Sequence, residues 1–501
     1  MSAPTWASGR APARRPALRA LSPRVALSAV VVAALAVRLI AGALGPLSED
    51  EAYYRLWSLQ PALGYFDHPP MIAWWIWAGR QIAGDTPLGV RLLPILAAGV
   101  TTLLTFDLAR ALGFSECVAA RAGVWLNATV LMGLGGQLAV PDQPNALFWT
   151  ATLCCAVRAT SGRPAWWLGA GAMAGLACLS KYSALFLAPG VLLWLALTPD
   201  GRRALRTPWP WLAAAVALAV FAPNIAWNAS HGWMTFAKQF GRIEPTAGLQ
   251  PSYVLKFVTD QFVLLNPLIA VFVGLAVRRR IAWPLLAIAA PFAAYLLVHS
   301  LHDEVQGQWP APLYPMLMVA AAAAAEGVTG WRAGLRAAAA PLAFAVFPAM
   351  LAFTLLPSDG RLPFRDPAMS LRGWPAFLHA VEAARVKAGA SWIGAPTYGI
   401  AAQLAASPHI HAPAVEFYER ERFTFETPAE RADFSKPGLI VVPGRGAGAG
   451  AMRGCFASVQ MLPEIDRGAG RGMTRYAVFR VEGPKRDIQR TGCFRPPLLK
   501  F

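Results

Sequence analysis

Acidic side chains and a histidine gather just after the first long apolar segment of the chain. The stretch "SEDEAYY" holds Glu49, Asp50 and Glu51 in a row, and "YFDHPP" adds Asp67 and His68. A carboxylate can take a proton from an attacking hydroxyl group, and the imidazole of histidine titrates near neutral pH. These residue types predict acid and base chemistry at a membrane boundary, although a solvated helix end explains Glu49 well.

The residues that follow Asp50 predict an amphipathic helix in the membrane interface. The sequence "AYYRLW" mixes aromatic, apolar and charged side chains, as interfacial helices do. On a helix, Asp50 and Tyr54 are four residues apart and share one face. Ionisable residues at a membrane boundary are often functional, so we favour a site role for Asp50 and keep Glu51, Tyr53 and Arg55 as further candidates.

The "YFDHPP" segment has two interpretations of equal weight. Pro69 and Pro70 end the preceding element and restrict His68 to an extended backbone. The segment is then either a rigid loop in which Asp67 caps the turn, or part of a site in which Asp67 and His68 contact a ligand.

Lys181 lies between two apolar runs, where only "SKY" separates them. A lysine at bilayer depth costs about 2.5 kcal/mol or more on insertion scales, and snorkelling at a helix end relieves that cost. Its alternative role is a point charge for a phosphate headgroup. Asp142 in "VPDQP" lies at another membrane boundary, where it either caps a helix N-terminus or joins the site.

Two later outer loops add polar and aromatic candidates. The segment "WNASHGWMTFAKQFGR" contributes His231, Lys238 and Arg242, and "QGQWP" contributes Gln308 and Trp309. Interfacial tryptophans are common anchors and prove nothing alone. Together, however, these segments describe a cavity at the membrane surface with a carboxylate, several cations and many aromatic rings. Such a cavity suits displacement at a sugar carbon, with a base for the attacking hydroxyl and cations for a departing phosphate.

The composition requires that these residues be positioned by membrane helices. The 501 residues are 56% hydrophobic and 14% charged, well below the charge of soluble domains. Apolar runs long enough to span a bilayer recur from residue 25 to residue 356. They predict about eleven transmembrane helices, at 25–45, 88–109, 117–138, 144–160, 164–180, 182–198, 208–225, 256–276, 281–299, 312–328 and 338–356.

The distribution of Lys and Arg predicts the orientation of these helices. Arginines concentrate in the tail 1–24 and in every second loop after it, which indicates a cytoplasmic face and a cytoplasmic N-terminus. The acidic first loop, residues 46–87, and the chain after the last span then lie on the periplasmic side. A cleaved signal peptide is the alternative for the first span, but Arg38 and a run of about twenty residues favour a retained helix. An anionic lipid surface explains the net charge of +18 better than nucleic acid does.

The composition changes after the membrane part, residues 25–356. Short strand-like runs alternate with helix-like stretches over residues 357–501, which predicts a small periplasmic α/β or α+β domain. Cys455 and Cys493 lie in this region, where an oxidising compartment would allow a disulfide. The cysteine spacing does not indicate a structural zinc site.

The motifs "DEAYYRLW", "GYFDHPPMIAWWIW", "PDQP", "LACLSKYSALFLAPG", "FAPNIAWNASHGWMTFAKQF" and "VQGQWPAPLYP" occur in one order along the chain. Together they resemble the bacterial glycosyltransferase family 39, which is related to protein O-mannosyltransferases and lipid A aminoarabinose transferases. The resemblance covers essentially residues 25–356 and extends to "LRGWPAFLHAV". It implies a GT-C fold and inverting transfer of a sugar from a polyprenyl-phosphate donor on the periplasmic face of the inner membrane.

The resemblance also implies roles for single residues. Asp50 matches the catalytic acid that activates the acceptor oxygen, and Lys181 matches a lysine near the donor phosphate or a site carboxylate. Asp67 takes the acidic position of a "YFEKP"-like segment, in which His68 replaces the Lys, and Tyr53 stands where aminoarabinose transferases carry an Arg. Two phosphate-binding cations are therefore missing, and Arg55, Lys238 or Arg242 are expected to substitute. Gln308 stands where related sequences often have Asn.

These departures argue against aminoarabinose as the sugar. The "AYY" and "FDHPP" forms look more like the subgroup that decorates lipid A or lipopolysaccharide core with galacturonic acid or galactosamine. We therefore expect lipid A or lipopolysaccharide as the acceptor, a protein acceptor as the alternative, and a transporter of lipid-linked sugars as a third reading. A divalent metal is expected to be dispensable, because the sequence shows no clean cluster of oxygen ligands.

Overall fold

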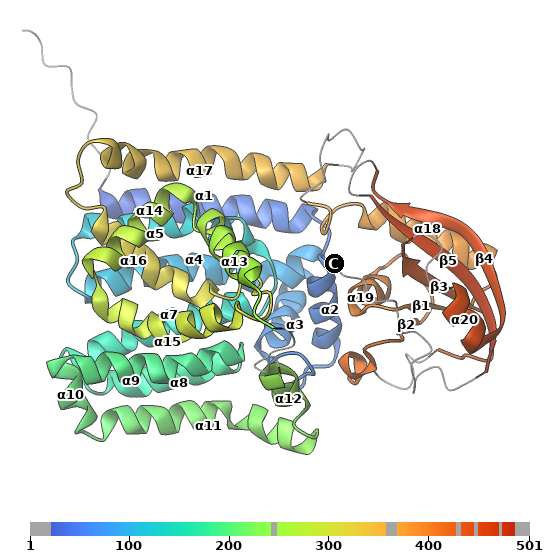
Figure 1. Ribbon diagram of the computed structural model, residues 1–501, viewed down its shortest axis with the longest axis horizontal. Coiled ribbons are helices and arrows are strands. Elements are labelled where there is room, and N and C mark those ends of the chain that lie inside the picture. Colours follow the sequence, from blue (N-terminus) through green and yellow to red (C-terminus); the bar gives the residue numbers. More distant parts are fainter. Residues whose placement is uncertain are drawn as a thin grey trace, which may run out of the picture.

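The computed structural model describes residues 22–241, 248–356, 368–426, 432–444, 449–469 and 473–485. A bundle of long helices occupies one end of the molecule, and a mixed sheet with its own helices occupies the other (Figure 1). Helices α2 and α3 lie at the end of the bundle that faces the sheet. The predicted combination of a helical membrane part and a small C-terminal domain containing strands is confirmed.

Each of the eleven predicted spans overlaps a helix or a pair of helices. The helices of the bundle are α1 (Pro23–Leu44), α4 (Pro87–Ala111), α5 (Glu116–Ala128), α6 (Val130–Gly133), α7 (Asp142–Thr160), α8 (Trp166–Cys178), α9 (Leu187–Leu197), α10 (Pro199–Leu205), α11 (Trp209–Ser230), α12 (Met234–Phe240), α13 (Pro251–Leu264), α14 (Pro267–Arg279), α15 (Trp283–His299), α16 (Tyr314–Ala324) and α17 (Trp331–Leu355). By length and composition, four helices of the described chain can cross a membrane, namely α1, α4, α11 and α17, or up to seven if each bent pair is one span.

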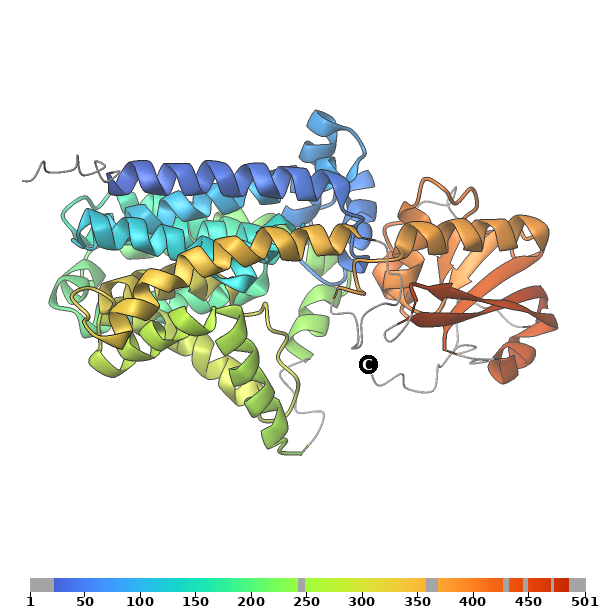
Figure 2. The ribbon, with the colours of Figure 1, turned by 90° about the horizontal axis from the view of Figure 1, so that it is seen from above.

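The predicted span at 256–276 coincides with two helices rather than one, because the chain bends by 110° between α13 and α14. Asn266 adopts a positive φ of 70°, and its side chain accepts a hydrogen bond from the backbone of Leu268. Pro267 follows at the first position of α14, where its missing N–H costs nothing. An Asn-Pro pair thus ends one helix and starts another, and α13 leans away from the long helices (Figure 2).

Two short helices form the first outer loop, α2 (Glu49–Leu59) and α3 (Met71–Ala83). Ser48 caps α2: its hydroxyl accepts a hydrogen bond from the Glu51 backbone, and the Glu51 carboxylate accepts one from the Ser48 backbone. This reciprocal capping box fixes where α2 begins. The predicted interfacial helix after Asp50 is present, although most of its side chains are buried rather than facing a lipid surface.

The C-terminal region contains a five-stranded mixed sheet of order β2-β1-β3-β5-β4. Strand β1 pairs in parallel with β2 and β3, and β5 is antiparallel to both β3 and β4. The elements are β1 (Trp392–Ala395), β2 (Ala414–Glu416), β3 (Gly438–Pro443), β4 (Phe456–Arg467), β5 (Thr474–Pro484), α18 (Trp374–Lys387), α19 (Tyr398–Ala406), α20 (Ala449–Cys455) and the 3₁₀ turn Arg420–Phe423. Cys455 is disulfide-bonded, and Cys493 lies outside the described residues.

One apolar core joins the first outer loop to the sheet. It contains Tyr53 and Trp57 of α2 and Ile72 of α3, together with Phe377 of α18 and Ile400 of α19. Burial of such side chains contributes roughly 1.5–3 kcal/mol each. Helix α2 is therefore held between the bundle and the sheet, and residues from both parts can reach the same cavity.

Candidate active site

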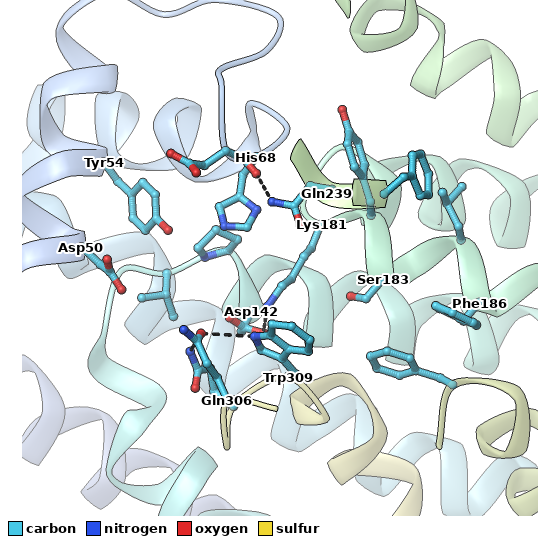
Figure 3. Close-up of a pocket in the computed structure, with 18 of the residues that line it drawn as sticks. Asp50, Tyr54, His68, Asp142, Lys181, Ser183, Phe186, Gln239, Gln306 and Trp309 are labelled. Atoms are coloured by element: carbon cyan, nitrogen blue, oxygen red, sulfur yellow. Dashed lines mark hydrogen bonds and ion pairs between the residues drawn. The ribbon is translucent and has the colours of Figure 1, made fainter. Parts of the chain in front are cut away.

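A cavity of about 510 Å³ opens at the end of the bundle that faces the sheet. Its walls come from α2, the "YFDHPP" loop, the segments around Asp142 and Lys181, α12, and the loop before α16. Nine of the residues selected from the sequence line it: Asp50, Tyr53, Tyr54, Asp67, His68, Asp142, Lys181, Gln308 and Trp309. Figure 3 shows Asp50 and Tyr54 on one side of the cavity and the Lys181–Asp142 pair on another.

Asp50 lies in the first turn of α2, where the capping box sets the start of the helix. Its Oδ1 accepts a hydrogen bond of 2.8 Å from the hydroxyl of Tyr398, the first residue of α19. Burial raises the pKa of Asp50, although the Tyr398 hydrogen bond and the charge of Arg422 act in the opposite direction. A carboxylate with a raised pKa beside a cavity is a stronger base than a solvated one, and so suits proton abstraction.

Glu51 is completely buried on another face of α2, away from the cavity lining. Its carboxylate accepts two hydrogen bonds of 2.7 Å from Arg91 of α4 and one of 3.0 Å from the Ala139 backbone. Burial alone would raise the pKa of Glu51, but Arg91 and the backbone donors lower it below its usual range. Glu51 is thus engaged in a structural ion pair that anchors α2 to α4.

Lys181 and Asp142 form an ion pair of 2.7 Å inside the cavity. Asp142 is the first residue of α7, and the N-cap position is taken by Pro141. Lys181 follows α8, and the backbone N–H of Met71 donates to the carbonyl of Leu179 nearby, which ties this segment to the start of α3. The ion pair satisfies both charges, so Lys181 does not need to snorkel into water.

Asp67 is the centre of a second group of polar residues. Arg422, from the 3₁₀ turn after β2, makes an ion pair of 2.6 Å with Asp67 Oδ2. The Tyr53 hydroxyl lies 3.0 Å from the same oxygen and 2.8 Å from the backbone carbonyl of Arg422. Burial raises the pKa of Asp67, and Arg422 and Tyr53 act against that shift. The backbone of Asp67 also accepts a hydrogen bond from Gln239 of α12.

The other candidates from the sequence lie away from the cavity lining. Arg55 pairs with Asp85, 2.5 Å between Nη2 and Oδ2. His231 is exposed and stacks on Trp227, with ring centroids 4.0 Å apart. Lys238 lies 5.4 Å from the ring centroid of Phe66. Arg242 falls outside the described residues.

Sequence reasoning missed Tyr398 and Arg422, both of which line the cavity. Arg422 belongs to "YERERF", a charged run typical of a solvated surface, and it is more than 350 residues from Asp67. The sequence carries no local signal that this turn folds back onto α2. Gln239 and Gln306 also line the cavity and were not selected. In the described part of the chain, no group of three or more His, Cys, Asp or Glu side chains is arranged to hold a metal ion.

Solved structures with the same fold are found across nearly the whole chain. Over 91% of this chain and 97% of the other, the structure superimposes on ArnT from Cupriavidus metallidurans bound to undecaprenyl phosphate, with a TM-score of 0.65 and 14% identity. The apo state of the same ArnT gives a TM-score of 0.64 at 16% identity, over 92% of this chain and 98% of the other. The chain therefore has the GT-C fold of ArnT, as the motifs imply.

Sequence comparisons point to the same group of proteins. Residues 67–227 match the family described as dolichyl-phosphate-mannose-protein mannosyltransferase. The chain is also 31% identical over 239 residues to the lipid A galacturonosyltransferase RgtD of Rhizobium johnstonii. That match covers 46% of this chain and 49% of the relative, so it spans about half the length of each protein. These findings confirm the resemblance to the ArnT and protein mannosyltransferase type.

Proposed function

We propose that this protein is an inverting glycosyltransferase that moves a sugar from a polyprenyl-phosphate donor to lipid A or lipopolysaccharide. The observation that carries the proposal is the cavity, in which the partly buried carboxylate of Asp50, whose pKa is raised, shares the walls with two acid–cation pairs. The identity to a lipid A galacturonosyltransferase supports lipid A as the acceptor. The likeness to ArnT bound to undecaprenyl phosphate supports a lipid-linked donor.

Asp50 acts as the general base in this proposal. The acceptor hydroxyl attacks the anomeric carbon, its proton passes to the Asp50 carboxylate, and the bond between the anomeric carbon and the phosphate oxygen breaks. Attack from the face opposite the leaving group inverts the anomeric configuration. If the acceptor oxygen is already ionised, Asp50 instead needs its proton to hold that oxygen by a hydrogen bond, which its raised pKa favours.

Lys181 stabilises the leaving group. Negative charge grows on the phosphate oxygen as the bond to the sugar breaks, and a fixed ammonium group nearby lowers the energy of that state. Asp142 holds Lys181 at 2.7 Å and so keeps its Nζ atom in place before the donor binds. His68 and Trp309 lie in the same walls and provide polar and aromatic surface for the sugar.

The proposed location is the bacterial inner membrane, with the cavity and the sheet domain in the periplasm and the N-terminus in the cytoplasm. The apolar helices α1, α4, α11 and α17 support membrane insertion. The arginine-rich loops at one end of the bundle support the orientation.

A protein acceptor is the second candidate, because residues 67–227 match a family whose description is a protein mannosyltransferase. Mass spectrometry of lipid A and of total glycoprotein, from cells with and without the gene, separates the two. We expect deletion to remove one sugar from lipid A or the core, and the intact gene to restore it. A loss confined to protein would instead establish the second candidate, and no loss in either fraction would contradict both.

A further inference from the structure

The C-terminal domain contributes a cation to the cavity through Arg422. The side chain of Arg422 is 12% exposed and lines the cavity together with Asp50 and Lys181. Its guanidinium carbon lies 4.2 Å from the centroid of the Tyr398 ring, so the cation stacks on an aromatic face. The guanidinium is therefore held in one orientation by a ring from α19 and a carboxylate from the first outer loop.

The hydrogen bonds of Arg422 leave donors available for a ligand. Nη1 donates to Asp67 Oδ2 at 2.6 Å. Nε lies 3.0 Å from a Glu419 oxygen but in an orientation that makes no hydrogen bond. An arginine carries five N–H donors. Of the three guanidinium nitrogens of Arg422, Nη1 alone donates a hydrogen bond to another described residue. A forked donor with unused N–H groups beside a cavity suits a phosphate or carboxylate.

The Arg422 turn contacts α2 directly, and the neighbouring helix α19 packs against the start of α2 and the residues before it. The Tyr53 hydroxyl lies 2.8 Å from the Arg422 carbonyl oxygen, and Gln403 of α19 donates to the Leu47 carbonyl at 2.8 Å. Gly399 packs so tightly on α2 that an added Cβ atom would clash with the Glu49 side chain. These contacts set the guanidinium in place before a ligand arrives, which reduces the ordering cost of binding.

We propose that Arg422 binds an anionic group of the donor in this cavity, and that Tyr53 is the positioning residue that holds the Arg422 turn against α2. The anion is either a phosphodiester oxygen or the carboxylate of an acidic sugar. Lys181 already has Asp142 as its counter-charge. A donor with two anionic groups would therefore meet two separate cations, each held by its own aspartate. The inference deepens the proposed glycosyl transfer and rests on it.

The affinity of the purified full-length protein for a donor lipid tests the inference. The first probe is undecaprenyl phosphate without sugar, and the variants are Arg422→Gln and Arg422→Lys. The control is Arg475→Gln, which removes an arginine of β5 that pairs with Asp466 on the sheet. If Arg422 contacts phosphate, Arg422→Gln weakens binding about tenfold or more, Arg422→Lys restores part of it, and the control binds as the wild type does.

Transfer assays with two donors distinguish the sources of the anion. If Arg422 contacts a sugar carboxylate, undecaprenyl phosphate binds normally to Arg422→Gln. In that case KM rises for a polyprenyl-phosphate uronic acid, and stays constant for the neutral hexose analogue. Unchanged affinity for undecaprenyl phosphate together with unchanged KM for both donors would overturn the inference. Tyr53→Phe should raise the same KM with a smaller effect on kcat.

The two proposals fail in different ways. A wild-type protein that transfers no sugar from either donor would contradict the glycosyl transfer. A wild-type protein that transfers sugar while Arg422→Gln keeps normal affinity and KM would contradict the inference alone.

Discussion

Two faces of helix α2 carry adjacent carboxylates that have opposite environments. Glu51 is buried against α4, and its oxygens accept two hydrogen bonds of 2.7 Å from Arg91 and one each from the backbone N–H groups of Ala139 and Ser48. Asp50 faces the cavity and accepts a hydrogen bond from the Tyr398 hydroxyl. The pKa of Glu51 is lowered by its cation, whereas the pKa of Asp50 is raised by burial.

This difference shows how one short acidic sequence can supply both a structural anchor and a reactive group. A carboxylate whose lone pairs are filled by arginine and backbone donors is held in its charged form and cannot readily accept a proton. A carboxylate that is buried without a full set of donors has a higher affinity for a proton. The Glu51–Arg91 pair fixes α2, and α2 in turn aims Asp50 into the cavity.

Removing the structural acid should have the largest effect on stability. Glu51→Ala leaves Arg91 buried without its counter-charge, and breaking a buried pair in this way costs about 3–5 kcal/mol. We expect the variant to unfold at a clearly lower temperature in detergent, or to fail to accumulate in the membrane. Asp85→Ala removes a partly exposed carboxylate that pairs with Arg55 and Arg80; it is the control and should cost less stability than Glu51→Ala. Equal losses in the two variants would contradict the structural role of Glu51.

Removing Lys181 should lower the efficiency with which the enzyme uses the donor. In Lys181→Ala the leaving phosphate loses a cation and Asp142 loses its partner, so we expect kcat/KM for the donor to fall by roughly 10- to 1000-fold. Lys256→Ala removes an exposed lysine that pairs with Asp260 and serves as the control. A normal kcat/KM in Lys181→Ala, measured with purified protein, would show that this lysine does not contact the donor phosphate.

The Tyr398 hydroxyl should set the pH at which Asp50 works. The hydrogen bond from Tyr398 favours the charged carboxylate, so its loss in Tyr398→Phe raises the pKa of Asp50 further. If the charged form is the base, the acidic limb of the pH–rate profile moves to higher pH, while the alkaline limb stays in place. If the acidic limb does not move, the group whose titration controls the rate is not Asp50.

Glu416 gives a smaller, pH-dependent effect in the sheet domain. Burial raises its pKa from 4.5 to about 7, although the backbone N–H groups of Glu419 and Tyr418 donate to one of its oxygens. The stability it contributes is therefore fully present below pH 4.5 and is lost as the pH rises through about 7. Glu416→Gln stays neutral and should gain up to about 3 kcal/mol over the wild type at pH 8 but little at pH 4.5. A gain that did not depend on pH would exclude titration of Glu416 as its cause.

Much of the membrane part could be predicted from the sequence, because spans are coded by local hydropathy. All eleven predicted spans overlap helices, and nine of the fourteen selected site residues line one cavity. Apolar composition located the segment at 256–276 but does not register the bend that Asn266 and Pro267 create within it. The bend depends on a local turn signal, the Asn-Pro pair, and not on hydropathy.

The missed part of the site depends on contacts that are distant in the sequence. Arg422 reaches Asp67 only because the core shared by α2, α18 and α19 brings the sheet domain against the first outer loop. Likewise, Asp142 could be expected to cap α7, but its partner Lys181 lies 39 residues away. No pattern within either segment encodes such pairings.

Transfer by Asp50→Asn, measured on purified protein, tests the central claim most directly. Asparagine keeps the size of the side chain and can still accept the Tyr398 hydrogen bond, but it cannot act as a base. We predict that transfer falls by about 10²- to 10⁴-fold while undecaprenyl phosphate still binds and the melting temperature is close to that of the wild type. A normal transfer rate in this variant would contradict the assignment of Asp50 and, with it, the division of roles between the two faces of α2.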